Sequence, residues 1–120
     1  MPKVYWMYGY NIKEGRVQEY QAFINSKAFN EVCAEVEKES GMKCIETYGT
    51  IIPSSVEQGD YDAYDLWEMP SHAALDKLRR SPAMAKLSEM TYKFIEPRPV
   101  KSILLRKFSD LKVFYEPKKR

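Results

Sequence analysis

Residues 4–12 read VYWMYGYNI, and this stretch decides the fold. Aromatic and β-branched residues dominate it, which is typical of a β-strand. Because side chains alternate along a strand, one face carries an aromatic and apolar set: Val4, Trp6, Tyr8, Tyr10 and Ile12. Lys13-Glu14-Gly15 then forms a turn. From Arg16 the apolar residues recur at helical spacing, which predicts a helix that ends at Ser40-Gly41.

The remaining chain predicts three more strands and a second helical region. The strands are 42–52, 61–69 and 100–108. Ser71 caps the helical region, and Ser81-Pro82 restarts it. The resulting order is βαββαβ, the ferredoxin-like arrangement of an α+β fold, with a four-stranded antiparallel sheet and two helices on one of its faces. We expect one domain over residues 1–110 and an extension over 111–120, a short strand followed by a basic tail.

The other face of this sheet has no helix to cover it. Its candidate residues include Met7, Ile45 and Ile51 together with polar side chains, a mixture too apolar for water. A two-fold dimer covers such a face economically because it uses one surface twice. The pattern therefore predicts a homodimer, or a higher homo-oligomer, in which two sheets pack face to face.

Length and composition exclude several classes of protein. A chain of 120 residues with 44% hydrophobic and 30% charged residues is one folded domain and not a disordered segment. No apolar run approaches the roughly 18 residues of a membrane span, and the first residues lack the apolar core of a signal peptide. These features predict a cytoplasmic protein with no membrane partner. Two cysteines and one histidine predict no metal site, and the scattered glycines predict no phosphate-binding cofactor loop.

The charge is distributed unevenly along the chain. Residues 1–70 hold 6 Lys and Arg against 12 Asp and Glu, whereas residues 71–120 hold 13 against 5, so the balances of −6 and +8 give the net charge of +2. We interpret this as acidic and basic surfaces that lie beside each other in one domain or meet across a dimer.

Three stretches resemble the dimeric α+β barrel superfamily, which includes antibiotic-biosynthesis monooxygenases, stress-response barrel proteins and NIPSNAP-like proteins. They are the strand, turn and helix opening of residues 10–20, the strand-to-helix junction of residues 66–75 that begins Leu66-Trp67, and the Ser81-Pro82 break in residues 78–84. The resemblance implies a dimeric barrel and a small-ligand pocket between the sheet and its helices.

By this resemblance Trp6, Tyr8 and Tyr10 line the pocket, and we add Trp67 to the predicted ligand-binding group. Haem-degrading members of the superfamily use an Asn, a Trp and a His. The corresponding positions here hold Tyr8, Lys77 and either Leu87 or Ser88. None of these matches, so haem degradation is not expected.

His72 is the candidate catalytic residue. It is the single histidine and lies in the first turn of a predicted helix, where the helix dipole favours the neutral imidazole that can act as a base. The third strand carries Asp62, Asp65 and Glu68, one of which can serve as a general base if it is buried. The favoured interpretation leaves these carboxylates exposed or paired with basic residues: Arg98, Lys101 or Arg106.

Two functions remain open at this point. The first is a homodimeric protein that binds a small molecule, which includes a cofactor-independent, monooxygenase-like enzyme acting on an aromatic or polyketide-like substrate. The second is a non-enzymatic module for dimerisation or assembly. RNA-recognition domains share the βαββαβ order, but an acidic third strand that carries Asp60, Asp62, Asp65 and Glu68 repels phosphate, so no nucleic-acid partner is expected.

Overall fold

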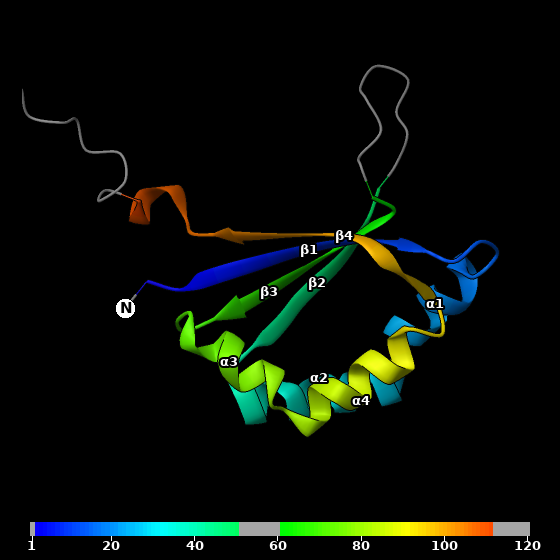
Figure 1. Cartoon of the computed structure of the whole chain (residues 1–120), viewed down its shortest axis with the longest axis horizontal. Helices are drawn as coiled ribbons and strands as arrows, with labels where there is room; N and C mark the ends of the chain where they lie inside the picture. The colour runs from blue at the N-terminus through cyan, green and yellow to red at the C-terminus, as the bar shows by residue number, and fades with distance from the viewer. Residues whose placement is uncertain (1, 51–60, 112–120) are drawn as a thin grey trace, which may run out of the picture.

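The computed structural model describes residues 2–50 and 61–111. Four strands form one antiparallel sheet in the order β2-β3-β1-β4. All four α-helices lie on one side of this sheet (Figure 1). The elements are β1 (Val4–Ile12), α1 (Val17–Ile24), α2 (Lys27–Ser40), β2 (Lys43–Gly49), β3 (Ala63–Met69), α3 (Ala73–Arg79), α4 (Pro82–Thr91), β4 (Ile95–Leu105) and a short 3-10 turn (Phe108–Asp110). The predicted ferredoxin-like α+β fold is confirmed.

The single helix predicted between Arg16 and Ser40 is wrong, because the chain forms two helices there. Ser26 separates them: its hydroxyl donates to the Phe23 carbonyl oxygen at 2.5 Å and accepts from the Phe29 backbone N–H at 3.1 Å. These bonds end one helix and cap the next. The predicted end of this helical region at Ser40-Gly41 is confirmed, because Gly41 caps α2 in a left-handed conformation with φ of 82°.

Strand β4 begins earlier than predicted, at Ile95 instead of Val100, and ends at Leu105. Tyr10 pairs with Val100 while Ile12 pairs with Ile95, so residues 96–99 bulge out of the ladder. This bulge contains Pro97 and Pro99, which is where an edge strand tolerates proline. Phe108 lies in the 3-10 turn and not in a strand. Beyond Leu111, the predicted extension over 111–120 lies outside the described residues, as do residues 51–60, which include Ile51 of the predicted open face.

A bulge in β2 corrects the predicted alternation of that strand. Cys44 lies opposite Trp67 and Glu46 lies opposite Leu66, so Ile45 is an extra residue between two successive pairs. Cys44 therefore faces the helices, but Glu46 does not, although strict alternation would put these two residues on one face. Beyond the bulge Thr47 lies opposite Asp65 and reaches the helix side of the sheet.

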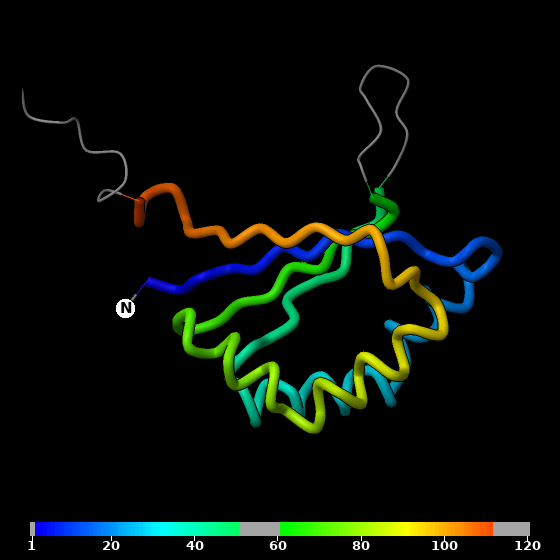
Figure 2. Tube along the Cα trace, viewed as in Figure 1, coloured from blue at the N-terminus to red at the C-terminus, as the bar shows by residue number. Residues whose placement is uncertain are grey.

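The main core lies between the sheet and helices α2, α3 and α4. Its most deeply buried members are Val4, Val36, Met42 and Met69. Helix α4 packs mainly against α2 and bows away from the sheet (Figure 2). Its first turn is tied to α2 by the Glu39 carboxylate, which accepts from the Ser81 hydroxyl at 2.6 Å and from the Ala83 backbone N–H at 3.0 Å. These bonds lower the pKa of Glu39. Ser81 caps α4 and Pro82 opens it, as predicted.

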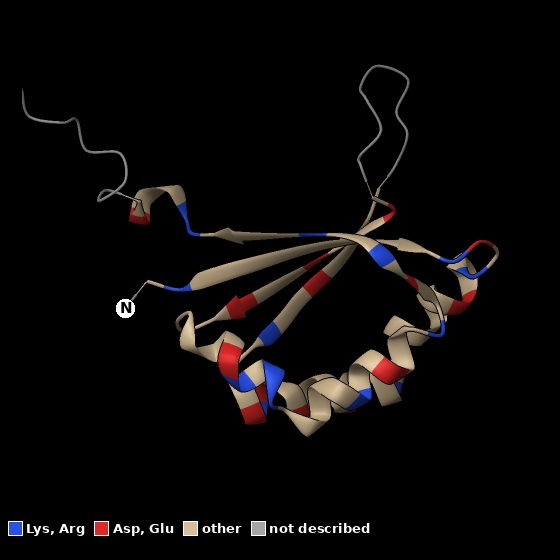
Figure 3. Cartoon of the chain, in the orientation of Figure 1, with Lys and Arg blue, Asp and Glu red and all other residues tan. Residues whose placement is uncertain are grey.

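Acidic and basic residues are interspersed around the helices (Figure 3). The acidic first half and the basic second half of the chain therefore contribute to common surfaces. This arrangement fits the interpretation that the charge asymmetry along the sequence reflects neighbouring surfaces of one domain.

Candidate functional site

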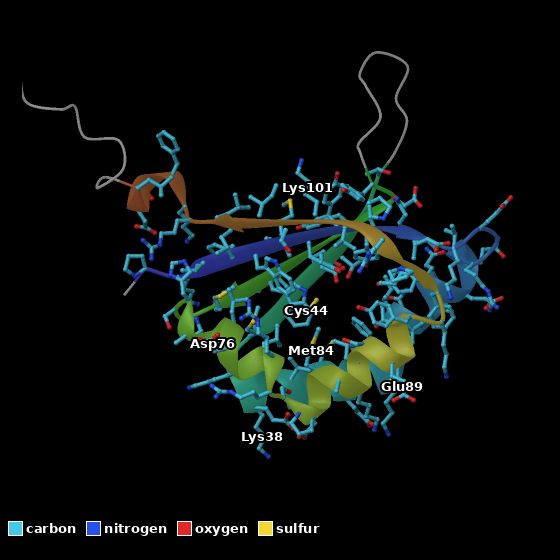
Figure 4. All side chains as sticks on the ribbon, in the orientation of Figure 1. Lys38, Cys44, Asp76, Met84, Glu89 and Lys101 are labelled. Carbon is cyan, nitrogen blue, oxygen red and sulfur yellow. The ribbon has the colours of Figure 1, made fainter. Side chains whose placement is uncertain are left out.

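A cavity of about 300 Å³ lies between the sheet and helix α4. Its walls come from β1, β3, α4 and the start of β4. The lining residues are Trp6, Tyr8, Tyr10, Asp65, Trp67, Met84, Leu87, Ser88, Thr91, Tyr92 and Ile95. In Figure 4, Met84 points from its helix into the space beneath the sheet, whereas Lys101 lies on the opposite side of the sheet. The fold thus brings together all four residues predicted to bind a ligand: Trp6, Tyr8, Tyr10 and Trp67.

These four aromatic rings form a continuous wall. The ring centroids of Trp6 and Tyr8 lie 5.1 Å apart, those of Trp6 and Trp67 6.2 Å, and those of Tyr8 and Tyr10 5.9 Å. Tyr10 and Trp67 are 1% and 3% exposed, so they form the floor of the cavity. The Trp6 indole N–H is held by the Ser102 hydroxyl, which accepts it at 3.0 Å. Such a wall suits a flat or apolar molecule.

Asp65 supplies a carboxyl group to this otherwise apolar floor. The Tyr10 hydroxyl donates to its Oδ1 at 2.7 Å, and the Thr47 hydroxyl donates to the same oxygen at 2.9 Å. The Tyr10 hydroxyl also lies 2.6 Å from the Tyr20 hydroxyl on α1. When the Tyr10 hydroxyl donates to the carboxylate, the Tyr20 hydroxyl donates to the Tyr10 oxygen. A chain of hydrogen bonds therefore runs from α1 through β1 to β3 and β2.

The environment of Asp65 changes its acidity. Burial raises the pKa of Asp65 to about 6, although the hydrogen bonds from Tyr10 and Thr47 favour the carboxylate and oppose this rise. Burial likewise raises the pKa of Tyr10, and the nearby Asp65 charge adds to the effect, so this phenol stays neutral and acts as a donor. A carboxyl group with a pKa near neutrality can bind a donor on a ligand or exchange a proton with it.

Asp65 was not expected here, because the three acidic residues of the third strand were interpreted mainly as exposed or paired with basic residues. The structure corrects this for Asp65 and places the other two outside the cavity. Asp62 is exposed and accepts from the Ile12 backbone N–H at 2.9 Å, and Glu68 pairs with Lys3. The signal for Asp65 was present in the sequence, since its two-residue spacing from Trp67 puts both side chains on one face of a strand.

His72 does not reach the cavity. It is exposed, directly precedes helix α3, and is not among the described residues that line the cavity wall. Among the described residues that line the cavity, Asp65 supplies the carboxylate that can accept a proton from a ligand. Neither cysteine is activated as a nucleophile, because burial raises the pKa of Cys33 to about 12 and also raises that of Cys44.

Within residues 2–50 and 61–111, His, Cys, Asp and Glu form no group of three that could hold a metal ion. In the same part of the chain, every helix is too short or too polar to cross a bilayer.

Comparisons with solved structures place the fold. The chain is similar to a dimeric protein of unknown function with a ferredoxin-like fold from Bacteroides fragilis, at 12% identity and a TM-score of 0.59 over 88% of this chain and 96% of that one. It is also similar to a Dabb family protein with a ferredoxin-like fold from Mesorhizobium loti, at 13% identity and a TM-score of 0.57 over 88% and 96% of the two chains.

A third similar structure is a NIPSNAP domain protein from Burkholderia xenovorans, at 14% identity and a TM-score of 0.58 over 89% of this chain and 96% of that one. No family model matches the sequence, and no curated protein matches it. At these identities the likeness concerns the fold. The chain therefore has the ferredoxin-like fold that these solved structures share, which agrees with the predicted fold.

Proposed function

We propose that this chain is a homodimeric barrel protein that binds a small, largely apolar molecule in the cavity between its sheet and helix α4. The observation that carries the proposal is the cavity itself, in which four aromatic residues and one half-buried carboxyl group share a space of about 300 Å³. Binding sites for small molecules commonly combine an apolar wall with a few fixed polar groups.

The open face of the sheet supports the dimer. Met7 lies opposite Leu66 on one side and opposite Ile103 on the other, so an apolar row crosses three strands. The α-helices formed by the described residues lie on the far side of the sheet (Figure 1). A related structure with this fold is described as dimeric. Exposed apolar area of this kind favours pairing with a second copy across a two-fold axis.

The expected monooxygenase-like oxidation has less support than the binding of a small molecule. The matched structures described above are named by fold or family and not by a monooxygenase activity. Cofactor-independent oxidation of an aromatic or polyketide-like substrate requires a substrate anion. The described cavity wall offers such an anion no Lys, Arg or His to stabilise its charge. We therefore propose binding as the function of the cavity.

The alternative is a non-enzymatic assembly module, which the apolar open face favours. The two functions differ in whether the cavity is occupied. Native mass spectrometry of the gently purified protein separates them. We expect a dimer that carries additional mass, released on denaturation. A bare dimer that binds none of a panel of apolar probes leaves the assembly function.

A cavity-filling substitution tests the site directly. Ser88 is half-buried on α4 and lines the cavity, so Ser88→Phe places a ring inside it. We expect this variant to lose the bound mass and to weaken probe binding by at least about tenfold, since a displaced ligand loses most of its apolar contact. The measurement is native mass spectrometry with fluorescence titration.

The matched control is Ala85→Phe, which adds the same ring to an exposed position on the same helix, away from the cavity wall. It is expected to bind like the unmodified protein. Equal binding by the Ser88→Phe variant and the control would contradict this site.

A further inference from the structure

The described part of the cavity wall carries negative charge and no positive charge. Among the described residues that line it, Asp65 is the one that carries a charge near neutral pH, and none is Lys, Arg or His. Lys13 contacts a lining residue, but its ammonium donates to the backbone carbonyl oxygen of Tyr92 at 2.9 Å, and Lys13 is not part of the wall. A ligand in this cavity therefore meets a carboxylate that no basic lining residue neutralises.

The aromatic wall favours a positively charged ligand, as the Asp65 carboxylate does. The faces of indole and phenol rings carry negative charge density and attract a cation that lies within about 6 Å of the ring centre. Trp6 and Tyr8, half-buried and with ring centroids 5.1 Å apart, lie on the same face of the sheet as Asp65. Trp67 is two residues from Asp65 on the same strand and closes the floor. The rings and the carboxylate thus both attract a positively charged group on a ligand.

We propose that the ligand is an organic ammonium ion, an apolar or aromatic molecule that carries a protonated amine. This inference rests on the proposed function of the cavity and adds the chemical class of its ligand. The amine donates to the carboxylate of Asp65, and the apolar part packs on the rings of Trp6, Tyr8 and Trp67. Tyr10 and Thr47 hold the carboxylate through Oδ1, which orients it before the ligand arrives.

An anionic ligand fits this site poorly. Its charge would lie near Asp65 without a compensating basic group in the described wall, and close like charges repel strongly where water is excluded. The hydroxyls of Tyr10 and Thr47 already donate to Asp65, so these donors are not available to a ligand anion while the carboxylate is ionised.

The chain supplies its own probe for a test. Its two tryptophans, Trp6 and Trp67, both line the cavity, so intrinsic fluorescence reports occupancy. The test titrates the protein at neutral pH with phenethylamine, phenethyl alcohol and phenylacetate, which share a phenyl group and differ in charge. We expect phenethylamine to bind at least about tenfold more tightly than the alcohol and phenylacetate to bind most weakly.

Variants assign the preference to one carboxylate. In Asp65→Asn we expect the affinities for the amine and the alcohol to come within about threefold of each other. The control is Asp62→Asn, which removes a carboxylate from an exposed position outside the cavity and is expected to keep the preference. Alcohol or phenylacetate binding as tightly as the amine overturns the charge inference but keeps the pocket. Failure of all three probes to bind overturns the proposed pocket as well.

Discussion

Replacing Asp65 with Asn is expected to stabilise the protein at pH 7. The unmodified chain must bury a carboxylate there, and burial raises the pKa of Asp65 to about 6 against about 3.9 in an unfolded chain. This difference of about two pKa units corresponds to roughly 3 kcal/mol at most. An Asn side chain carries no charge, and its carbonyl oxygen can accept from Tyr10 and Thr47 in the same place. We expect the melting temperature to rise by roughly 5 °C or more at pH 7.

The pH dependence follows from the direction of the shift. Between pH 6 and 4 the folded state holds a proton on Asp65 that the unfolded state has released, so the free energy of unfolding rises as the pH falls through this window. The advantage of Asp65→Asn should therefore be largest at pH 7 and shrink to almost nothing near pH 4. Thermal unfolding of both proteins from pH 4 to pH 7.5 measures it.

Asp62→Asn serves as the control for this experiment, since Asp62 is exposed on the same hairpin. Its effect on the melting temperature at pH 7 should be smaller than that of Asp65→Asn. An Asp65→Asn variant that is equally destabilised at both ends of the pH range would contradict the view that this carboxyl group is strained by burial.

The second large effect concerns the open face of the sheet. Leu66→Glu introduces a carboxylate beside Met7 in the centre of that face, and the proposed dimer would bury one such carboxylate from each copy. Burying unpaired like charges costs several kcal/mol, so we expect the dimer dissociation constant to rise by about a thousandfold. Analytical ultracentrifugation across a concentration series measures the change.

Val17→Glu is the matched control, because Val17 is 58% exposed on helix α1, on the other side of the sheet. It should remain dimeric. Circular dichroism should show that both variants are folded, since Leu66 is not part of either buried cluster of the chain. A Leu66→Glu protein that remains a dimer at low micromolar concentration would place the interface elsewhere.

Local patterns were sufficient to predict the aromatic half of the candidate site. Alternation along residues 4–12 correctly assigns Trp6, Tyr8 and Tyr10 to one face, because β1 is paired on both sides and keeps a regular register from Val4 to Tyr10. The same rule applied to β3 places Asp65 beside Trp67. Its charge nevertheless favoured an exposed position, because aspartate is rarely buried without a partner.

Other features depend on contacts between distant segments. Thr47 reaches Asp65 because Ile45 is the extra residue of a bulge, and nothing in the local sequence KCIETYG marks that bulge. The cavity exists because α4 packs on α2 and leaves the sheet uncovered beneath Ser88 and Thr91. Helix spacing predicts which residues of α4 face inward, but it does not predict how far the helix lies from the sheet.

The prolines of β4 have a consequence for colloidal behaviour. Strand β4 forms one edge of the sheet, and an unprotected edge can recruit strands from other molecules until fibrils grow. Pro97 and Pro99 lack the N–H groups that a recruited strand would need, and the bulge of residues 96–99 interrupts the regular ladder. At this end of the edge the chain therefore resists open-ended polymerisation, while its broad face remains available for a closed, finite assembly.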